Sequence, residues 1–262
     1  MSTKRVQPNK DLAGCTVVIT RPAGTGTTLA KKARALGGVP LLLPGLSLRA
    51  APDTQQVRVQ WRDAQRDDVL IFTSPAAVRY ASALAPLGRT HGAVIAVGQG
   101  TARAMQRLGV AAEMPASRQD SEGVLALPSL QQLRGRRIAM ITAPGGRGLM
   151  PQQLAERGAV LRHVYVYQRA AARLTRRHVE AVQQLSADTC VLFSSAEAIE
   201  NLRAQLPPSA WQNLCKATAI VSSERIAQAA QQAGCLRLYR AASAAQADLL
   251  AAACQAHSRQ HH

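Results

Sequence analysis

The sequence predicts an α/β fold with two similar domains, each built on a parallel sheet, and three observations lead to this prediction. Buried strands alternate with helices along the chain, which is typical of parallel sheets covered by helices on both faces. Residues of the first half recur in the second half at a constant offset of 121 positions. The chain has 262 residues, 47% of them hydrophobic, which is enough to bury two ordinary cores.

The repeat keeps its register from Gly14 to Pro86 without a gap. Apolar positions match in kind across it, as Val17 matches Ile138 and Ile71 matches Leu192. The identical pairs are Gly14 and Gly135, Gly24 and Gly145, Gly37 and Gly158, Val39 and Val160, Asp67 and Asp188, Phe72 and Phe193, Ser74 and Ser195, Ala77 and Ala198, and Pro86 and Pro207. The repeat unit has the size of a domain rather than of a solenoid repeat. Two such domains in one chain predict a ligand-binding cleft between them.

The first half contains three predicted strands and an extended segment, at 15–20, 68–73, 93–97 and 39–48. Gly37 and Gly38 end a predicted helix over 27–36. Ser74 and Pro75 provide the N-cap and the first turn of the next helix. One further helix follows the turn at 98–101 and ends near Gly109, and another follows Ser121, which is its expected N-cap.

The second half repeats this order. Strands and an extended segment are expected at 138–141, 189–193, 217–221 and 160–169. Helices are expected over 149–157, after the serines at 194–195, and from 222–224 to Gly234. Because ligands of parallel sheets bind beyond the carboxyl ends of the strands, the turns that follow these strands are the candidate binding loops.

The net charge is the most unusual number in the composition. Lys and Arg total 32 against 15 Asp and Glu, which gives +17. Such a field attracts polyanions. Aromatic residues are only 3% and no nucleic-acid-binding signature is present, so no specific nucleic-acid partner is expected. The charge reflects either a solvated basic surface or a strongly acidic ligand.

Several classes of protein are excluded by what the chain does not contain. The five cysteines are widely spaced and form no CxxC pair, so a disulfide scaffold or zinc site is not expected. This use of cysteine suits the reducing cytoplasm. The longest uncharged stretch, 35–48, is too short to span a bilayer, so no membrane insertion is expected. Residues 1–12 lack the apolar core of a signal peptide and are predicted to be a disordered basic tail.

The chemistry-bearing motifs are limited to the predicted turns. No dinucleotide fingerprint, Walker loop, nucleophile elbow, metal-ligand cluster or pair of carboxylates is present, so no metal and no cofactor is expected. Backbone N–H groups at helix starts, together with Ser or Thr hydroxyls, form anion sites. The candidate turns are 20–26, 73–74, 98–101, 141–147, 194–195 and 222–224. A serine at such a place also serves simply as a helix cap.

Short strings in these turns, taken together and in order, resemble the uroporphyrinogen-III synthase family. They are ITRP at 19–22, FTSPAAV at 72–78, AVGQGTA at 96–102, SEGVL at 121–125, GGR at 145–147, VYVY at 164–167 and FSS at 193–195. The resemblance extends from Gly14 to about Leu250. It implies two α/β domains joined by extended linkers at 41–48 and 164–171. Domain 1 would then be 13–42 plus 170–255 and domain 2 would be 46–165, whereas the sequence alone leaves open a tandem division near 127–135.

The resemblance implies a lyase that cyclises hydroxymethylbilane, a linear tetrapyrrole with eight carboxylates. The reaction loses water and inverts the last pyrrole ring to give uroporphyrinogen III, on the route to haem. Without an enzyme the bilane closes to the symmetrical type I isomer, so the enzyme must favour the spiro intermediate that leads to type III. Holding the substrate in one conformation achieves this. A monomer that acts in the cytoplasm without a cofactor is expected.

The resemblance also implies roles for individual residues. Tyr167 would hydrogen-bond the substrate and help its hydroxyl to leave, whereas Tyr165, on the other side of the strand, would pack. Arg21 and Arg147 would be the cationic contacts of the substrate carboxylates. The hydroxyls of Ser74, Thr101 and Ser195 would bind the acetate and propionate arms.

One turn departs from the family pattern. The family often has a Gly-x-x-Thr-Ala turn in both halves, and here the second copy reads VSSER at 221–225. This alignment places Arg225 at the position of Thr101. Ser222 or Ser223 would then supply the missing hydroxyl.

Two other functions remain as alternatives. The first is a non-catalytic, two-domain module that binds an acidic small molecule. The second is a nucleic-acid-associated protein, which rests on charge alone and would show affinity that falls steeply with salt. Formation of type III product that depends on Tyr167 would favour the enzyme over both.

Overall fold

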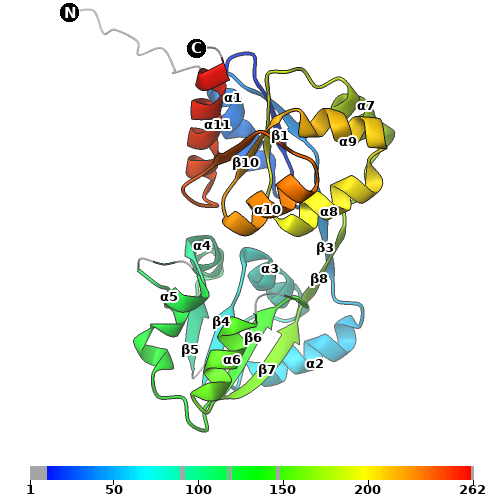
Figure 1. Cartoon of the computed structure of the whole chain (residues 1–262). Helices are drawn as coiled ribbons and strands as arrows, with labels where there is room; N and C mark the ends of the chain where they lie inside the picture. The colour runs from blue at the N-terminus through cyan, green and yellow to red at the C-terminus, as the bar shows by residue number, and fades with distance from the viewer. Residues whose placement is uncertain (1–10, 89–91, 117, 119, 146–147, 261–262) are drawn as a thin grey trace, which may run out of the picture. The chain divides into compact units, whose positions relative to one another are not determined.

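The computed structural model describes residues 11–88, 92–116, 118, 120–145 and 148–260, and divides the chain into two compact units (Figure 1). The chain changes unit between Ser47 and Leu48 and again between Arg169 and Ala170. Unit 1 therefore contains both ends of the described chain, and unit 2 contains its middle. Both changes occur within strands, β3 (Leu46–Ala50) and β8 (Tyr167–Ala171), which pair with each other in a two-stranded sheet.

Unit 1 contains a five-stranded parallel sheet in the order β11-β10-β9-β1-β2. Its strands are β1 (Thr16–Ile19), β2 (Val39–Leu42), β9 (Thr189–Leu192), β10 (Thr218–Val221) and β11 (Leu238–Arg240). Thr16 of β1 lies opposite Val39 on one side and Thr189 on the other. The first strand of the chain thus pairs directly with a strand of its last third.

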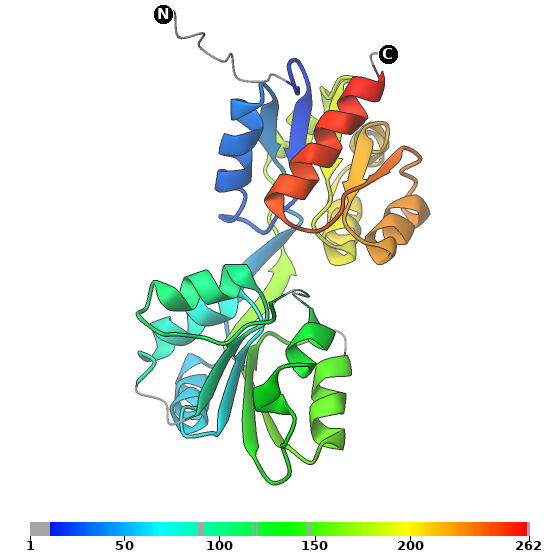
Figure 2. The ribbon, with the colours of Figure 1, turned by 90° about the vertical axis from the view of Figure 1, so that its left-hand side faces the viewer.

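Helices cover both faces of this sheet (Figures 1 and 2). On one face lie α1 (Thr27–Ala35) and α11 (Gln246–Gln260), and on the other α7 (Arg176–Gln183), α8 (Ala196–Gln205), α9 (Pro208–Cys215) and α10 (Glu224–Gln232). Successive side chains of a strand point to opposite faces. Val17 and Ile19 accordingly pack with α1 and α11, whereas Val18 packs in the opposite core.

Unit 2 contains a four-stranded parallel sheet in the order β5-β4-β6-β7. Its strands are β4 (Val69–Phe72), β5 (Ala93–Ala96), β6 (Arg137–Thr142) and β7 (Val160–Tyr165). One core packs against α2 (Thr54–Ala64), α3 (Pro75–Leu84) and α4 (Gln99–Gln106), and the other against α5 (Ser121–Leu125), η1 (Pro128–Leu130) and α6 (Leu149–Glu156). The predicted α/β class with parallel sheets is therefore confirmed.

The elements of the two halves correspond in pairs. β1, β2 and β3 begin 121 residues before β6, β7 and β8, and α3 stands in the same relation to α8. From β5 and β10 onward the offset is 125, because the second half has four more residues where α9 lies. In unit 2, Ile95 of β5 forms a parallel bridge with Glu113. This bridge corresponds to the pairing of β10 with β11 in unit 1. Each sheet therefore combines strands from both halves of the repeat.

Some local predictions are corrected by the structure. The N-cap of α5 is Asp120 rather than Ser121, because the Asp120 carboxylate accepts a 2.9 Å hydrogen bond from the Gly123 N–H. Residues 1–10 of the predicted tail lie outside the described residues. Leu12, predicted to belong to that tail, is instead fully buried, and its N–H donates to the Leu36 carbonyl at 2.9 Å.

Four helices, α2, α7, α9 and α11, lie where the sequence pattern above predicts none. Helix α2 carries a signal that reveals it. Asp53 accepts a hydrogen bond from the Gln56 N–H at 2.9 Å as an N-cap, and Val57 and Trp61, four residues apart, are both buried.

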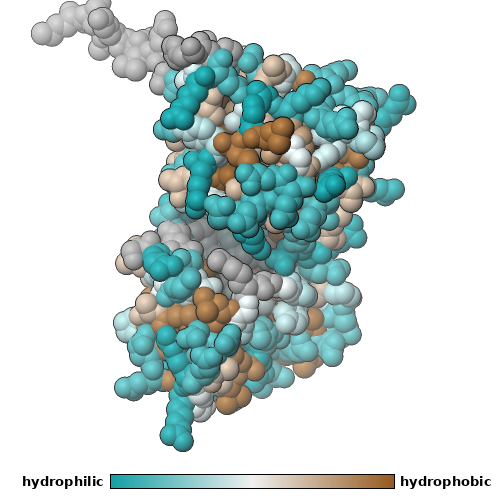
Figure 3. Space-filling model, in the orientation of Figure 1, coloured by the Kyte–Doolittle hydropathy of each residue, from teal (hydrophilic) through white to brown (hydrophobic). Residues whose placement is uncertain are grey.

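On the face drawn in Figure 3, hydrophilic residues predominate and hydrophobic residues gather in separate patches. No helix within the described ranges has both the length and the apolar character needed to cross a bilayer.

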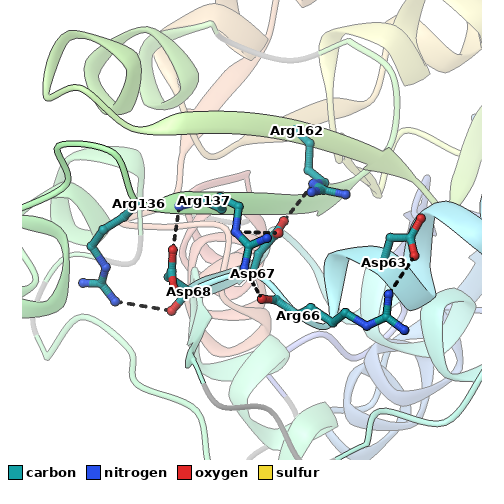
Figure 4. A network of polar contacts seen from close by, with 7 residues as sticks. All are labelled: Asp63, Arg66, Asp67, Asp68, Arg136, Arg137 and Arg162. Atoms are coloured by element: carbon teal, nitrogen blue, oxygen red, sulfur yellow. Dashed lines mark hydrogen bonds and ion pairs between the residues drawn. The ribbon is translucent and has the colours of Figure 1, made fainter.

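A network of charged residues joins three strands of unit 2 (Figure 4). The Asp67 side chain, just before β4, is 0% exposed; its Oδ2 lies 2.8 Å from Arg162 Nε of β7, and its Oδ1 lies 3.8 Å from Arg137 Nε of β6. The neighbouring Asp68 accepts a 2.8 Å hydrogen bond from the Arg137 N–H. Burial raises the pKa of Asp67 above its ordinary value, and the two guanidinium groups oppose this rise. The network thus links the residues that precede β4 to β6 and β7.

The raised pKa of Asp67 predicts how stability changes with pH. A carboxyl group with a raised pKa in the folded state contributes stability that is fully present below its unfolded pKa, about 4, and is lost as pH rises through the folded pKa. The stability advantage of the wild type over Asp67→Asn should therefore shrink from about pH 4 upward, by about 1.4 kcal/mol per unit of pKa shift. Urea unfolding of both proteins across this range measures it. Asp63→Asn, which replaces a 52% exposed carboxylate with an amide, should show no comparable trend. An advantage of the wild type over Asp67→Asn that grows with pH would contradict the assignment.

Candidate functional site

Tyr167 and Ser74 meet at the carboxyl edge of the sheet in unit 2. Tyr167 begins β8 and is only 7% exposed, and its hydroxyl lies 3.1 Å from the Ser74 hydroxyl. Ser74 is the N-cap of α3, where its oxygen accepts the Ala77 N–H at 3.1 Å. The predicted Ser-Pro start of α3 is confirmed, and it holds the Ser74 side chain against the phenol.

Tyr80 is a third member of this group and is absent from the residues predicted above. Its ring stacks on that of Tyr167, with centroids 5.5 Å apart and planes 14° from parallel. Its hydroxyl donates a 2.7 Å hydrogen bond to the Leu48 carbonyl of β3. Tyr80 thus contacts both strands in which the chain changes unit. The chain has only four tyrosines, and this scarcity on a helix that follows a candidate turn is the signal that could have identified it.

Neighbouring turns of unit 2 supply further hydroxyls. Thr101 lies in the first turn of α4 and is 3% exposed, and its N–H donates to the Gly98 carbonyl at 2.9 Å. The hydroxyl of Thr73, which follows β4, lies 2.9 Å from that of Thr142 at the end of β6. The carboxyl ends of adjacent strands are therefore tied together by side chains.

The carboxyl edge of unit 1 has a related arrangement. Ser195 caps α8 and accepts the Ala198 N–H at 3.1 Å, the same length as the Ser74 cap. Thr20, fully buried after β1, accepts the Ser194 N–H at 3.0 Å, and the Ser194 hydroxyl donates to the Thr20 carbonyl at 3.1 Å. These reciprocal bonds hold the ends of β1 and β9 together.

Arg21 follows Thr20 at this edge and is half-buried. Burial lowers the pKa of Arg21, and none of the carboxylates in the described ranges forms an ion pair with it. A guanidinium remains charged in proteins, so this is a partly desolvated cation suited to an anionic ligand. Arg147, its predicted counterpart in unit 2, lies outside the described residues.

The predicted alignment of Arg225 with Thr101 is wrong. Ser223 is the N-cap of α10, as Gly98 is of α4. The Ile226 N–H donates to the Ser223 carbonyl just as the Thr101 N–H donates to that of Gly98, so Ile226 takes the place of Thr101. The offset here is 125 rather than 124. Ser223 is engaged as a cap, with Ile226 N 3.4 Å from its hydroxyl, and Ser222 stands half-buried before it.

The tyrosines of unit 2 have no counterparts in unit 1. Tyr167 corresponds to Leu46 and Tyr80 corresponds to Asn201 at the offset of 121. Tyr165, predicted to pack, is instead 42% exposed, and its ring lies against that of His163 at 5.7 Å. The capping serines are shared by both units, whereas the buried Tyr167 and the partly buried Tyr80 belong to one.

The structure thus brings Tyr167 and Ser74 into contact and places Thr101 on the neighbouring helix of the same unit. Arg21, Ser195 and Ser222 lie at the corresponding edge of unit 1. Within the described part of the chain, no group of three or more His, Cys, Asp or Glu side chains is arranged to hold a metal ion. The sites present are hydroxyls, helix starts and a cation, which bind and orient anionic groups.

Comparison with known proteins gives one consistent result. The family model described as "Uroporphyrinogen-III synthase HemD" matches residues 27–251. The uroporphyrinogen-III synthases of Salmonella typhimurium (strain LT2) and Escherichia coli (strain K12) are each 29% identical to the chain over 226 residues, which cover 83% of this chain and 91% of each relative.

Two solved structures share the fold. The chain matches a mutant uroporphyrinogen III synthase from the extremely thermophilic bacterium Thermus thermophilus with a TM-score of 0.60 at 22% identity, covering 94% of this chain and 99% of that one. It matches the uroporphyrinogen-III synthetase from Helicobacter pylori 26695 with a TM-score of 0.60 at 17% identity, covering 90% of this chain and 97% of that one.

The two capping serines predict a matched pair of stability effects. Ser74→Ala and Ser195→Ala each remove one N-cap hydrogen bond, so each should lower the free energy of unfolding by about 1 kcal/mol. Ser74→Ala also removes the partner of the Tyr167 hydroxyl and should be the more destabilising of the two. Chemical denaturation of both variants measures this. An equal or smaller loss for Ser74→Ala would show that its contact with Tyr167 adds nothing to stability.

Proposed function

The chain belongs to the uroporphyrinogen-III synthase family, and from this we propose how its residues carry out the family's reaction. The enzyme is a cyclising hydro-lyase that converts hydroxymethylbilane into uroporphyrinogen III, with loss of water and inversion of the last pyrrole ring. The match over 27–251 is the observation that carries the activity, and it favours the enzyme over a non-catalytic binding module.

The chemical problem is one of selection rather than of activation. The bilane loses its hydroxyl and closes without help, but to the type I isomer. A preference of 10³ for the type III route needs only about 4 kcal/mol of differential stabilisation. Binding groups that fix the folded conformation of the bilane can supply this amount.

We assign the departure of the hydroxyl to Tyr167. The Ser74 oxygen already accepts the Ala77 N–H, so its own proton is available for the Tyr167 oxygen at 3.1 Å. The phenol proton is then free to be donated to the leaving oxygen of the substrate. This hydrogen bond is the observation that supports the role. Tyr80 acts as a positioning residue, because its stacked ring fixes the Tyr167 ring while its hydroxyl is anchored on Leu48.

We assign recognition of the carboxylates to the cation and the hydroxyls. Arg21 is partly desolvated and lacks an acidic partner among the described residues, so a substrate carboxylate can be its counter-ion. One such pair at 4 Å contributes roughly 4 kcal/mol at an effective dielectric constant of 20, before desolvation. Thr101, Ser195 and Ser222 lie at or just before helix starts and would bind further acetate or propionate groups.

Other features remain proposals. Arg147 is proposed as a second cationic contact on the family resemblance. The domain bounds are proposed as 13–42 plus 170–255 and 46–165, with linkers at 41–48 and 164–171. A monomer that acts in the cytoplasm, without metal or cofactor, completes the proposal.

Tyr167→Phe tests the assignment of the leaving-group step. The change removes the phenol hydroxyl and keeps the ring stacked on Tyr80, so the rate of type III formation should fall by about 10- to 100-fold. The measurement generates hydroxymethylbilane in situ, oxidises the products and separates the porphyrin isomers by chromatography. Tyr165→Phe, which alters an exposed phenol on the adjoining strand, is the control and should keep wild-type activity. Unchanged activity of Tyr167→Phe would refute the role.

Arg21→Gln tests the binding of carboxylates. Losing one charge pair that is present in both ground and transition states should raise KM about 10-fold or more and leave kcat nearly unchanged. Steady-state kinetics of the same coupled assay measure both constants. Arg176→Gln, which changes a side chain that is 92% exposed and paired with Glu180, is the matched control. A loss confined to kcat would contradict a pure binding role.

A further inference from the structure

Two cysteines of unit 1 lie side by side at the edge of the sheet opposite to the candidate site. Cys215 ends α9, just before β10, and Cys235 follows α10, just before β11. Their Sγ atoms are 2.8 Å apart, although 20 positions separate the two residues in the chain. Because β10 and β11 are parallel neighbours, their amino ends bring both thiols to one place.

The two thiols differ in exposure and in acidity. Cys235 is 1% exposed, whereas Cys215 is partly exposed. The Cys235 thiol, as a hydrogen-bond donor, lowers the pKa of Cys215, and the positive charge of Arg203 acts in the same direction. The same hydrogen bond, with burial, raises the pKa of Cys235. Cys215 is thus the thiol that ionises first and that solvent reaches.

A pocket of about 450 Å³ opens beside Cys215. Lys216 and Arg237 line it together with Trp211 and Leu236, and Leu236 is 86% exposed. The pocket therefore combines two cations, apolar surface and one accessible thiol. This combination suits a small anionic disulfide compound rather than a macromolecule.

We propose that Cys215 and Cys235 form a reversible dithiol–disulfide site that exchanges with small anionic disulfides. The Cys215 thiolate attacks one sulfur of the disulfide, forms a mixed disulfide and releases one thiolate. Cys235 then gives up its proton and attacks the Cys215 sulfur, which releases the second thiolate and closes the protein disulfide. Two electrons pass from the protein thiols to the small disulfide, and two small thiols leave.

The chain contains a control pair for this chemistry. Cys15 and Cys190 also interact with each other through their thiols, but both are 0% exposed, between β1 and β9 and the helices that cover them. A dissolved disulfide can reach neither of them in the folded protein. If proximity alone decided reactivity, the disulfide would oxidise both cysteine pairs. The proposal instead expects oxidation of the Cys215–Cys235 pair only.

The experiment uses the reduced, folded chain of 262 residues and oxidised glutathione as the probe. After alkylation of the remaining thiols, mass spectrometry should show a cross-linked peptide pair containing Cys215 and Cys235, about 2 Da lighter than the two thiols. Dithiothreitol should reverse it, and Cys15 and Cys190 should become alkylated only after unfolding. The Trp211 indole donates to the Ala233 carbonyl at 2.9 Å, so its fluorescence should change together with the cross-link.

Two variants separate the roles of the thiols. Cys235→Ser should accumulate a lasting mixed disulfide on Cys215, because the thiol that would displace the small molecule is missing. Cys215→Ser should leave Cys235 unmodified, because the probe cannot reach it. Equal oxidation of the Cys15–Cys190 pair, a mixed disulfide on Cys215 that persists in the wild type, or cross-linking that requires denaturant would each overturn the proposal.

Discussion

Parallel pairing between strands that lie far apart in the sequence is the constraint on which both units depend. In unit 1, Thr16 of β1 lies opposite Thr189 of β9, and in unit 2, Val69 of β4 lies opposite Ile138 of β6. A parallel pair requires a crossover connection, and the connection from β2 to β9 carries the whole of unit 2. If these central pairs were lost, β1 and β2 would remain as two strands, which are too few for independent stability.

The carboxyl edges of the two sheets share a scaffold but differ in their side chains. Both units place a capping serine after the corresponding strand, at Ser74 and at Ser195, with equal hydrogen-bond lengths. The scaffold at these positions is therefore the same. The chemistry differs where Tyr167 stands in unit 2 and Leu46 in unit 1, because only the phenol can exchange a proton or a hydrogen bond with a substrate. The repeat therefore conserves the framework at this edge while its side chains have diverged.

The sequence predicted those parts of the structure that depend on local chemistry. The strands other than β11, the Ser-Pro start of α3 and the fold class follow from hydrophobic runs, caps and breakers, and the structure confirms them. The short strand β11 was not predicted. Helix α9 lies where the offset of the repeat changes, so the repeat gives no template for it. The alignment of Arg225 with Thr101 failed in the second half after this point, because it used an offset of 124 where the structure has 125. The scarcity of tyrosine could have drawn attention to Tyr80, but its role could not be predicted, because that role depends on a stacked ring 87 positions away in the chain and on a carbonyl in β3.

The position of the two changes of unit also affects the order in which the protein can fold during synthesis. The ribosome makes β1 and β2 first, yet β1 finds its central neighbour only when β9 has emerged. Unit 2 lies entirely between them in the sequence and can complete its sheet first. The nascent β1, with Val17, Val18 and Ile19 fully or almost fully buried in the finished protein, must therefore wait without its central neighbour β9. Translation speed and chaperone binding over this interval bear on the yield of active enzyme more than they would for two domains folded in tandem.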